Sequence, residues 1–121
     1  MGNFTKNIAM SVRRELVMAR SLQINGHWQS AFKHLENAHV LGQLSTYWHT
    51  RVHILMLLWA WQRTDIREVI AQIIRITGAA TKTFAGLVPA GNTGGGNVSA
   101  FKPMPVSEAH RRAIMSARSK K

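Results

Sequence analysis

The chain of 121 residues contains no cysteine. Disulfide bonds and thiolate metal sites are therefore excluded, and any metal must be held by nitrogen, oxygen or thioether sulfur. Acidic residues are also scarce, with five Asp and Glu against sixteen Lys and Arg and a formal net charge of +11. Such an imbalance favours negatively charged partners, which are nucleic acid, an anionic membrane or an acidic protein. The alternative is a solvated basic surface with a basic tail, since five of the basic residues lie among the last eleven.

Long hydrophobic runs are absent as well. The longest one, residues 54–61, has eight residues, whereas a helix that crosses a bilayer needs about 20. The N-terminus shows no apolar run followed by a small-residue cleavage site, so a signal peptide is not predicted. We therefore expect a cytoplasmic protein with no membrane partner.

The apolar residues recur at three- and four-residue steps over four segments, which predicts helices over about 4–23, 28–41, 46–63 and 66–76. Gly26 and Gly42 are expected to end the first two helices. Ser45 or Thr46 is expected to cap the third helix, and Thr64 or Asp65 the fourth. Short turns between successive helices favour antiparallel neighbours. The predicted fold is all-α, an up-down antiparallel four-helix array or bundle.

The composition changes after residue 85, so the chain divides into three parts. Residues 1–85 are predicted to form the helical core. Residues 86–106 are rich in Gly, Asn and Pro and are expected to pack on the core as an irregular segment. Their glycine run would allow backbone N–H groups to cradle an anion, but it lacks the Lys-Ser/Thr of a nucleotide loop. Residues 107–121 are predicted to form a short helix capped by Ser107 and a basic tail.

Two helical pairs are the sharpest chemical signal: Glu36-x-x-His39 and His49-x-x-x-His53. Each spacing places both side chains on one face of a helix. The turn at residues 40–45 folds the two helices back on each other. One carboxylate and three imidazoles are therefore predicted to converge on the inner face near this turn.

Buried imidazoles and carboxylates need a hydrogen bond, an ion pair or a metal. The set Glu36, His39, His49 and His53 would suit a divalent transition metal, with zinc favoured and nickel, copper or iron left open. A hydrogen-bonded Glu–His network without metal is the alternative. Further candidate ligands are Glu15, Met56 and Glu68. For Met56, core packing is the favoured interpretation, and Glu68 shares a helix face with Gln72.

Other residues are assigned less specific roles. His27 and His34 fall off the inward line and are expected to be exposed, and His110 is expected in the tail. The third helix carries a second apolar face that would pack on the fourth helix or on a second copy of the chain, so a homodimer is left open. This face comprises Trp48, Leu55, Leu58 and Trp59.

Two familiar metal-enzyme assignments do not fit the spacing. Di-iron bundles need the Glu-x-x-His motif twice, and here it occurs once. The zinc-protease helix needs Glu directly after its first histidine, and Thr50 stands there.

Three stretches resemble a known family: residues 35–43 (LENAHVLGQ), His49-x-x-x-His53-x-x-Met56-Leu57, and residues 86–95 (GLVPAGNTGG). They are similar to the small bacterial proteins of domain-of-unknown-function family 3703. The resemblance implies that the Glu/His set and the Pro89-x-Gly-Asn-Thr-Gly loop belong to one shared design. It supplies no activity, and an association of relatives with metal-handling genes would favour a metal.

Three hypotheses follow. The first is a small metal-binding protein with its site between the second and third helices, serving metal homeostasis. The second is a metal-assisted hydrolase or oxygen-using enzyme, with Asn92, Thr93 or Asn97 lining a pocket. The third is a basic interaction module for nucleic acid or an acidic protein, in which the Glu–His cluster is purely structural.

Overall fold

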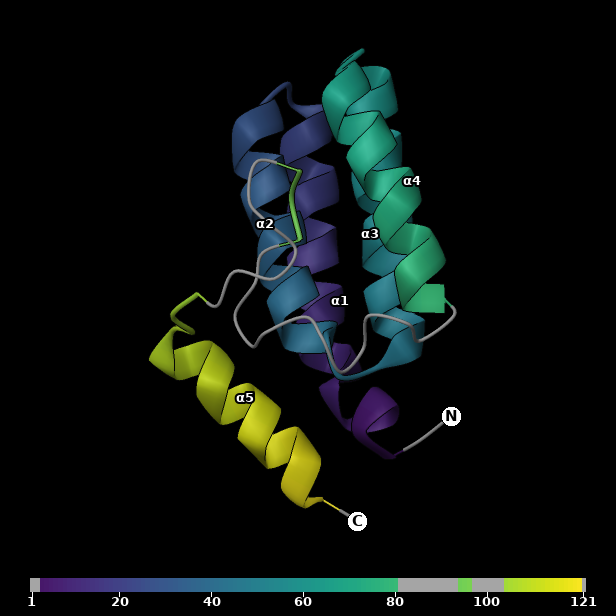
Figure 1. The fold of residues 1–121 in the computed structure, drawn as a ribbon. Coiled ribbons are helices and arrows are strands. Elements are labelled where there is room, and N and C mark those ends of the chain that lie inside the picture. Colours follow the sequence, from purple (N-terminus) through teal and green to yellow (C-terminus); the bar gives the residue numbers. More distant parts are fainter. Residues whose placement is uncertain (1–2, 81–93, 97–103, 121) are drawn as a thin grey trace.

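The computed structural model describes residues 3–80, 94–96 and 104–120 (Figure 1). These residues form five helices and no strand, which confirms the all-α prediction. The helices are α1 (Asn3–Ile24), α2 (Trp28–Gly42), α3 (Thr46–Gln62), α4 (Ile66–Ala80) and α5 (Glu108–Ser119). No helix in the described part of the chain combines the length and apolarity needed to span a bilayer.

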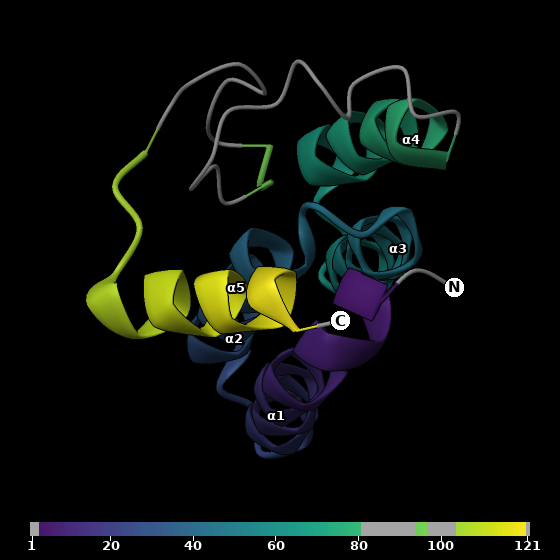
Figure 2. The same ribbon diagram turned by 90° about the horizontal axis from the view of Figure 1, so that it is seen from below.

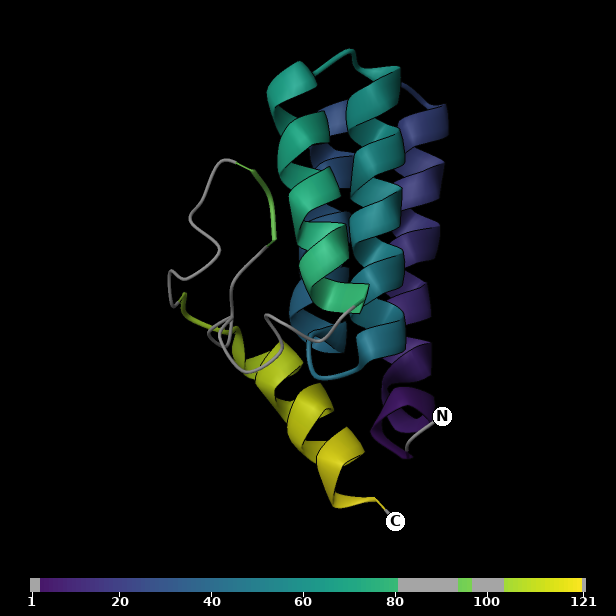
Figure 3. The same cartoon turned by 45° about the vertical axis from the view of Figure 1, so that its right-hand side comes forward.

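The first four helices run alternately up and down, joined by short turns (Figure 1). Helix α1 packs on α2, α2 on α3, and α3 on α4, while α5 lies across one end against α1 and α2 (Figure 2). Among the described helices, α4 packs on α3 alone (Figure 3). The four antiparallel helices therefore form an open array, and the side between α2 and α4 is not closed by a helix.

The predicted helix starts are confirmed by their side-chain caps. The hydroxyl of Ser45 accepts a hydrogen bond from the backbone N–H of Trp48 at 3.2 Å. Asp65 caps α4 in the same way, accepting from the N–H of Glu68 at 3.1 Å. Ser107 caps α5. Each cap satisfies a backbone donor that the first helical turn leaves without a partner.

Gly42 ends α2, but for a reason that the sequence pattern does not show. The next residue, Gln43, keeps a right-handed conformation with φ of −57°, so no left-handed cap follows the helix. A Cβ on Gly42 would lie 2.7 Å from the Cβ of Trp48. Gly42 therefore allows the end of α2 to approach the start of α3 closely, which brings the two helices together beside the histidines.

The core is formed by apolar side chains of α1, α2, α3 and α5. Trp48 and Trp59 belong to it, and their indole N–H groups donate to the carbonyl oxygens of Thr5 and Trp28, both at 2.9 Å. The expectation that these tryptophans cover α4 or a second copy is therefore wrong, because they pack against α1 and α2. Their indoles need a hydrogen-bond acceptor when buried, and the neighbouring backbones supply it.

Candidate metal centre

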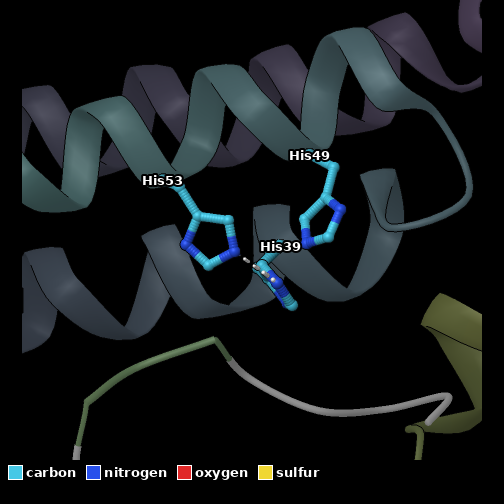
Figure 4. Close-up of side chains that lie close together, drawn as sticks. All are labelled: His39, His49 and His53. Carbon is cyan, nitrogen blue, oxygen red and sulfur yellow. Dashed lines mark hydrogen bonds between the residues drawn. The ribbon is translucent and has the colours of Figure 1, made fainter. Parts of the chain in front are cut away.

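Three histidines lie together between α2 and α3 (Figure 4). His39 comes from the last turns of α2, and His49 and His53 come from successive turns of α3. One ring nitrogen of each lies within 4.8 Å of the others. The ring centroids form a nearly equilateral triangle with sides of 4.7, 4.8 and 4.9 Å. The predicted convergence of the three imidazoles is thus observed.

All three imidazoles are buried, with 1–3% of each residue exposed. Burial disfavours the charged form of histidine, and it lowers the pKa of His49 to about 4. The pKa of His53 falls to about 3, chiefly through burial and then through the neighbouring His49, against the opposing effect of its hydrogen bond to Gln72. Both rings are therefore neutral at pH 7, which is the form that binds a metal.

Gln72 of α4 fixes the orientation of His53. Its amide nitrogen donates to Oε2 of Glu68 at 2.6 Å and to the carbonyl oxygen of Gly94 at 2.9 Å. Both partners are acceptors, so the amide cannot be turned around. Its oxygen must then face Nδ1 of His53, 2.6 Å away, and Nδ1 must carry the proton. The lone pair of neutral His53 is consequently on Nε2.

That lone pair points at His39. The Nε2 atoms of His39 and His53 lie 3.1 Å apart, a hydrogen-bonding distance when His39 supplies the proton. The same separation is close to the edge of a tetrahedral zinc site, since two nitrogens each about 2.0–2.1 Å from the metal lie about 3.3 Å apart. A ring flip or a tautomer change of His39 that takes its proton off Nε2 would leave two lone pairs facing one point.

The glycine segment Gly94–Gly96 lies against this cluster through its backbone. The N–H of Gly96 donates to both carboxylate oxygens of Glu68, at 2.9 and 2.7 Å, and the carbonyl of Gly95 accepts from Arg75 at 2.5 Å. The anion held by this part of the glycine run is therefore a carboxylate of the chain itself. These bonds tie the segment to α4, on the side that no helix closes.

Gly94 is in direct contact with His39. A Cβ at this position would lie 2.5 Å from Cδ2 and 2.8 Å from Nε2 of the imidazole, and the φ of Gly94 is +81°. Only glycine meets both conditions without strain. The backbone of Gly94 thus covers one side of His39 while its carbonyl holds Gln72.

The carboxylates among the other candidate ligands are not part of this group of converging ligand atoms. Glu36 is half-buried on α2 and is not among the residues whose ligand atoms converge. Met56 is fully buried in the core, as its preferred interpretation predicts. Glu68 is buried beside Gln72 and supports the site indirectly.

Glu15 belongs to a different cluster. Its carboxylate lies 2.6 Å from Nδ1 of His34 and 3.9 Å from Nε2 of His110, and Asn37 also donates to it. His34 is half-buried, so the expectation that it is exposed is wrong. His110 lies on α5, and its proximity to the Glu15 carboxylate connects α5 to α1. The helical periodicity of the sequence does not predict the contacts of Glu15 with His34 and His110, because these contacts depend on how α1, α2 and α5 pack together.

Sequence reasoning placed Gln72 beside Glu68 but did not assign either of them a role toward His53. The contacts of Arg75 and Gly94–Gly96 were also missed, since they join segments about twenty residues apart. The family resemblance had only grouped the loop that ends at Gly94 with the Glu/His set. The predicted pocket residues Asn92, Thr93 and Asn97 lie outside the described residues.

The family comparison agrees with the resemblance noted in the sequence. The family model of DUF3703, described as a protein of unknown function, matches residues 6–114. The chain belongs to this family. The match includes all three histidines, Gln72 and the glycine segment of the DUF3703 domain. No curated protein and no solved structure matches the chain, so the family description carries no activity to this site.

Proposed function

We propose that this DUF3703 protein binds one divalent transition metal ion through His39, His49 and His53. The observation that carries the proposal is the convergence of three buried imidazole nitrogens within 4.8 Å of one another. Three buried imidazoles need partners, because a buried polar ring costs several kcal/mol unless it finds one. A shared metal ion satisfies all three at once.

The arrangement around the rings supports this proposal. Histidine ligands usually donate their second ring N–H to a carbonyl, a carboxylate or a water, which fixes the ring and its tautomer. The bond from His53 to Gln72 has this form, and Gln72 is itself held by Glu68 and Gly94. His53 thus has the kind of supporting partner expected of a histidine ligand, which favours the proposal.

Zinc is the favoured ion, and nickel, copper and iron are the competitors. Imidazole ligands suit all four, and zinc is favoured because three histidines with one further ligand form a common zinc ligand set. Three histidines leave a fourth position for water or a further ligand, and Glu36 remains the candidate that the sequence offers for it. We place the protein in the cytoplasm, in a role in metal homeostasis.

A metal-assisted hydrolase is the second candidate, and the ligand count favours it. Three protein ligands with one open position is the arrangement of catalytic zinc sites, in which bound water becomes the nucleophile. Catalysis also needs access for a substrate. The imidazoles are 1–3% exposed, and this burial ranks storage or transfer of the metal above catalysis.

Elemental analysis of the purified protein tests the proposal. After growth in metal-replete medium, we expect close to one equivalent of metal in the unmodified protein. The variants His39→Ala and His53→Ala should each lose it. His27→Ala is the matched control, because His27 is an exposed histidine at the start of α2 and its loss should leave the metal content unchanged. A metal-free protein that gains no stability on titration with zinc would contradict the proposal and favour a purely structural histidine network.

A further inference from the structure

A groove with a volume of about 580 Å³ runs between α1 and α3, away from the three histidines. The two helices are parallel along it, because Trp48 near the start of α3 bonds to Thr5 near the start of α1. At the other end, the side chains of Gln23 and Gln62 are hydrogen-bonded to each other. The groove is therefore a long furrow between two aligned helices, open to solvent.

The walls of the groove have helical periodicity. On α1 they include Arg13, Leu16 and Arg20, and on α3 they include Arg51, Leu55 and Leu58. Each set recurs at steps of three or four residues, so each forms a ridge along its helix. Two ridges with a furrow between them are the surface into which a further helix packs.

The groove offers apolar side chains that no described residue covers. Val17 is 67% exposed, Ile24 is 73% exposed and Leu58 is 51% exposed, although all three are large hydrophobic residues. Buried tryptophans form its floor. Apolar surface of this kind marks a binding site more often than an isolated exposed leucine does.

The charge of the groove is of one sign. Arg13, Arg20 and Arg51 line it, and no Asp or Glu does. The guanidinium carbons of Arg13 and Arg51 lie 5.5 and 5.6 Å from the ring centroid of Trp48, so two positive groups share one level of the groove. Arg20 lies two turns further along α1, about 10 Å away at 1.5 Å per residue. Within the described ranges, none of the three forms an ion pair.

We propose that this groove binds an amphipathic helix of a partner protein, with an apolar face and acidic residues about seven positions apart. The stretch from Arg13 to Ile24 is about 16 Å long, which matches about eleven helical residues. Apolar anchors at helical spacing would meet Val17, Leu55 and Leu58, and the acidic residues would meet the arginines at their two levels. The proposal is independent of metal binding, because no residue of the groove is a proposed ligand.

Two other occupants fit less well. A fatty acid carries one charged group and would reach only one of the two arginine levels. A second copy of the chain would bring a net charge of +11 against a positive groove. Its acidic residues are already engaged, among them Glu15 with His34, Asp65 in capping, Glu68 with Gln72, and Glu108 with two arginines.

The test uses the full chain and a synthetic 14-residue helical peptide with leucines on one face and glutamates seven residues apart. Binding is followed by isothermal titration in low salt. We expect a saturable one-to-one complex that weakens at least tenfold in the double variant Arg13→Glu/Arg51→Glu and in Leu58→Asp. The matched control is Arg67→Glu/Arg112→Glu, which changes the net charge equally but lies outside the groove, and it should bind within about threefold of the unmodified chain.

Other outcomes would overturn the proposal. Equal weakening in the control would mean non-specific attraction of charge. Tighter binding of dodecanoate than of the peptide would assign the groove to a lipid anion, and a dimer in sedimentation that Leu58→Asp dissociates would assign it to a second copy. No binding at millimolar peptide would also contradict it. Metal content, measured in the same variants, should not change in any of these cases, so the two proposals fail separately.

Discussion

Nδ1 of His53 lies 2.6 Å from Oε1 of Gln72, and this contact determines which nitrogen of His53 faces His39. The amide of Gln72 cannot turn around, because its nitrogen already donates to two acceptors. A residue on α4 therefore sets the tautomer of a histidine on α3. Under the proposed function, this contact would keep the Nε2 lone pair of His53 available to a metal ion.

The variant Gln72→Leu tests the role of that amide. It removes the partner of His53 and leaves the carbonyl of Gly94 without the donor that Gln72 supplies. We expect zinc affinity to fall about 10–100-fold, as for other losses of a ligand's supporting hydrogen bond. Metal-free stability should fall by about 1–3 kcal/mol, because buried polar groups lose a partner. Competition with a chelating dye measures the first effect, and urea unfolding measures the second.

The control for this change is Gln29→Leu, since Gln29 is an exposed glutamine on α2. It should leave zinc affinity and stability nearly unchanged. If Gln72→Leu lowers stability but leaves the zinc affinity intact, Gln72 serves the fold and does not prepare the site.

Gly94→Ala tests the close contact of the glycine segment with His39. The new Cβ would lie 2.5 Å from Cδ2 of the imidazole, at a φ of +81°. Gly26→Ala is a matched control, because Gly26 has a φ of +82° and nothing within 4 Å of the added Cβ. Both variants place alanine at a positive φ, so the backbone cost is the same in each. We expect Gly94→Ala to lower the free energy of unfolding by about 2 kcal/mol more than Gly26→Ala does, because its new Cβ overpacks against His39. Equal losses in urea unfolding would show that Gly94 does not press on His39.

The sequence predicted the helices, their caps and the meeting of three histidines, because these depend on local spacing and on short turns. Gly26, Ser45 and Asp65 mark helix ends through chemistry that is local to each of them. The supporting layer was not predictable in this way. Gln72 meets His53 and Gly94 only after α4 has packed on α3 and the glycine segment has returned to both. Likewise, the pairing of Glu15 with His34 depends on the packing of α1 on α2.

We expect the free energy of unfolding of the metal-free protein to fall as the pH is lowered from 7 to 5. This range lies above the pH at which most carboxylates titrate. The pKa of His49 falls to about 4 and that of His53 to about 3 on folding, both from 6.5. Between pH 6.5 and these values the unfolded chain binds more protons, so stability is lost as pH falls through this window. The loss should be on the order of 1 kcal/mol per histidine and pH unit.

Urea unfolding of chelator-treated protein at pH 7, 6 and 5 measures this slope. The variant His53→Gln should show a shallower dependence, because one of the two shifted groups is gone. A stability that stays constant from pH 7 to pH 5 would mean that the histidines are not buried in the neutral form.

Thr64 holds a left-handed backbone with φ of 54° at the turn between α3 and α4. A β-branched residue is strained there, by about 1–2 kcal/mol relative to its usual conformations. Thr64→Gly removes the strain but adds chain entropy, so we expect a net gain of up to about 1 kcal/mol in the free energy of unfolding. Thermal unfolding measures the gain, and Thr77→Gly, inside α4, should lower stability instead. A loss at both positions would show that Thr64 is not strained.

The proposed function rests on one metal ion bound by the imidazoles of His39, His49 and His53. X-ray absorption at the zinc edge, on protein loaded with one equivalent of zinc, tests it most directly because it counts the imidazole ligands. We predict three imidazole nitrogens at about 2.0–2.1 Å and one oxygen ligand that completes a tetrahedron. In His53→Ala the imidazole count should fall to two or the zinc should be lost. A zinc shell of oxygen atoms with one imidazole or none, or no stoichiometric binding at all, would contradict the account.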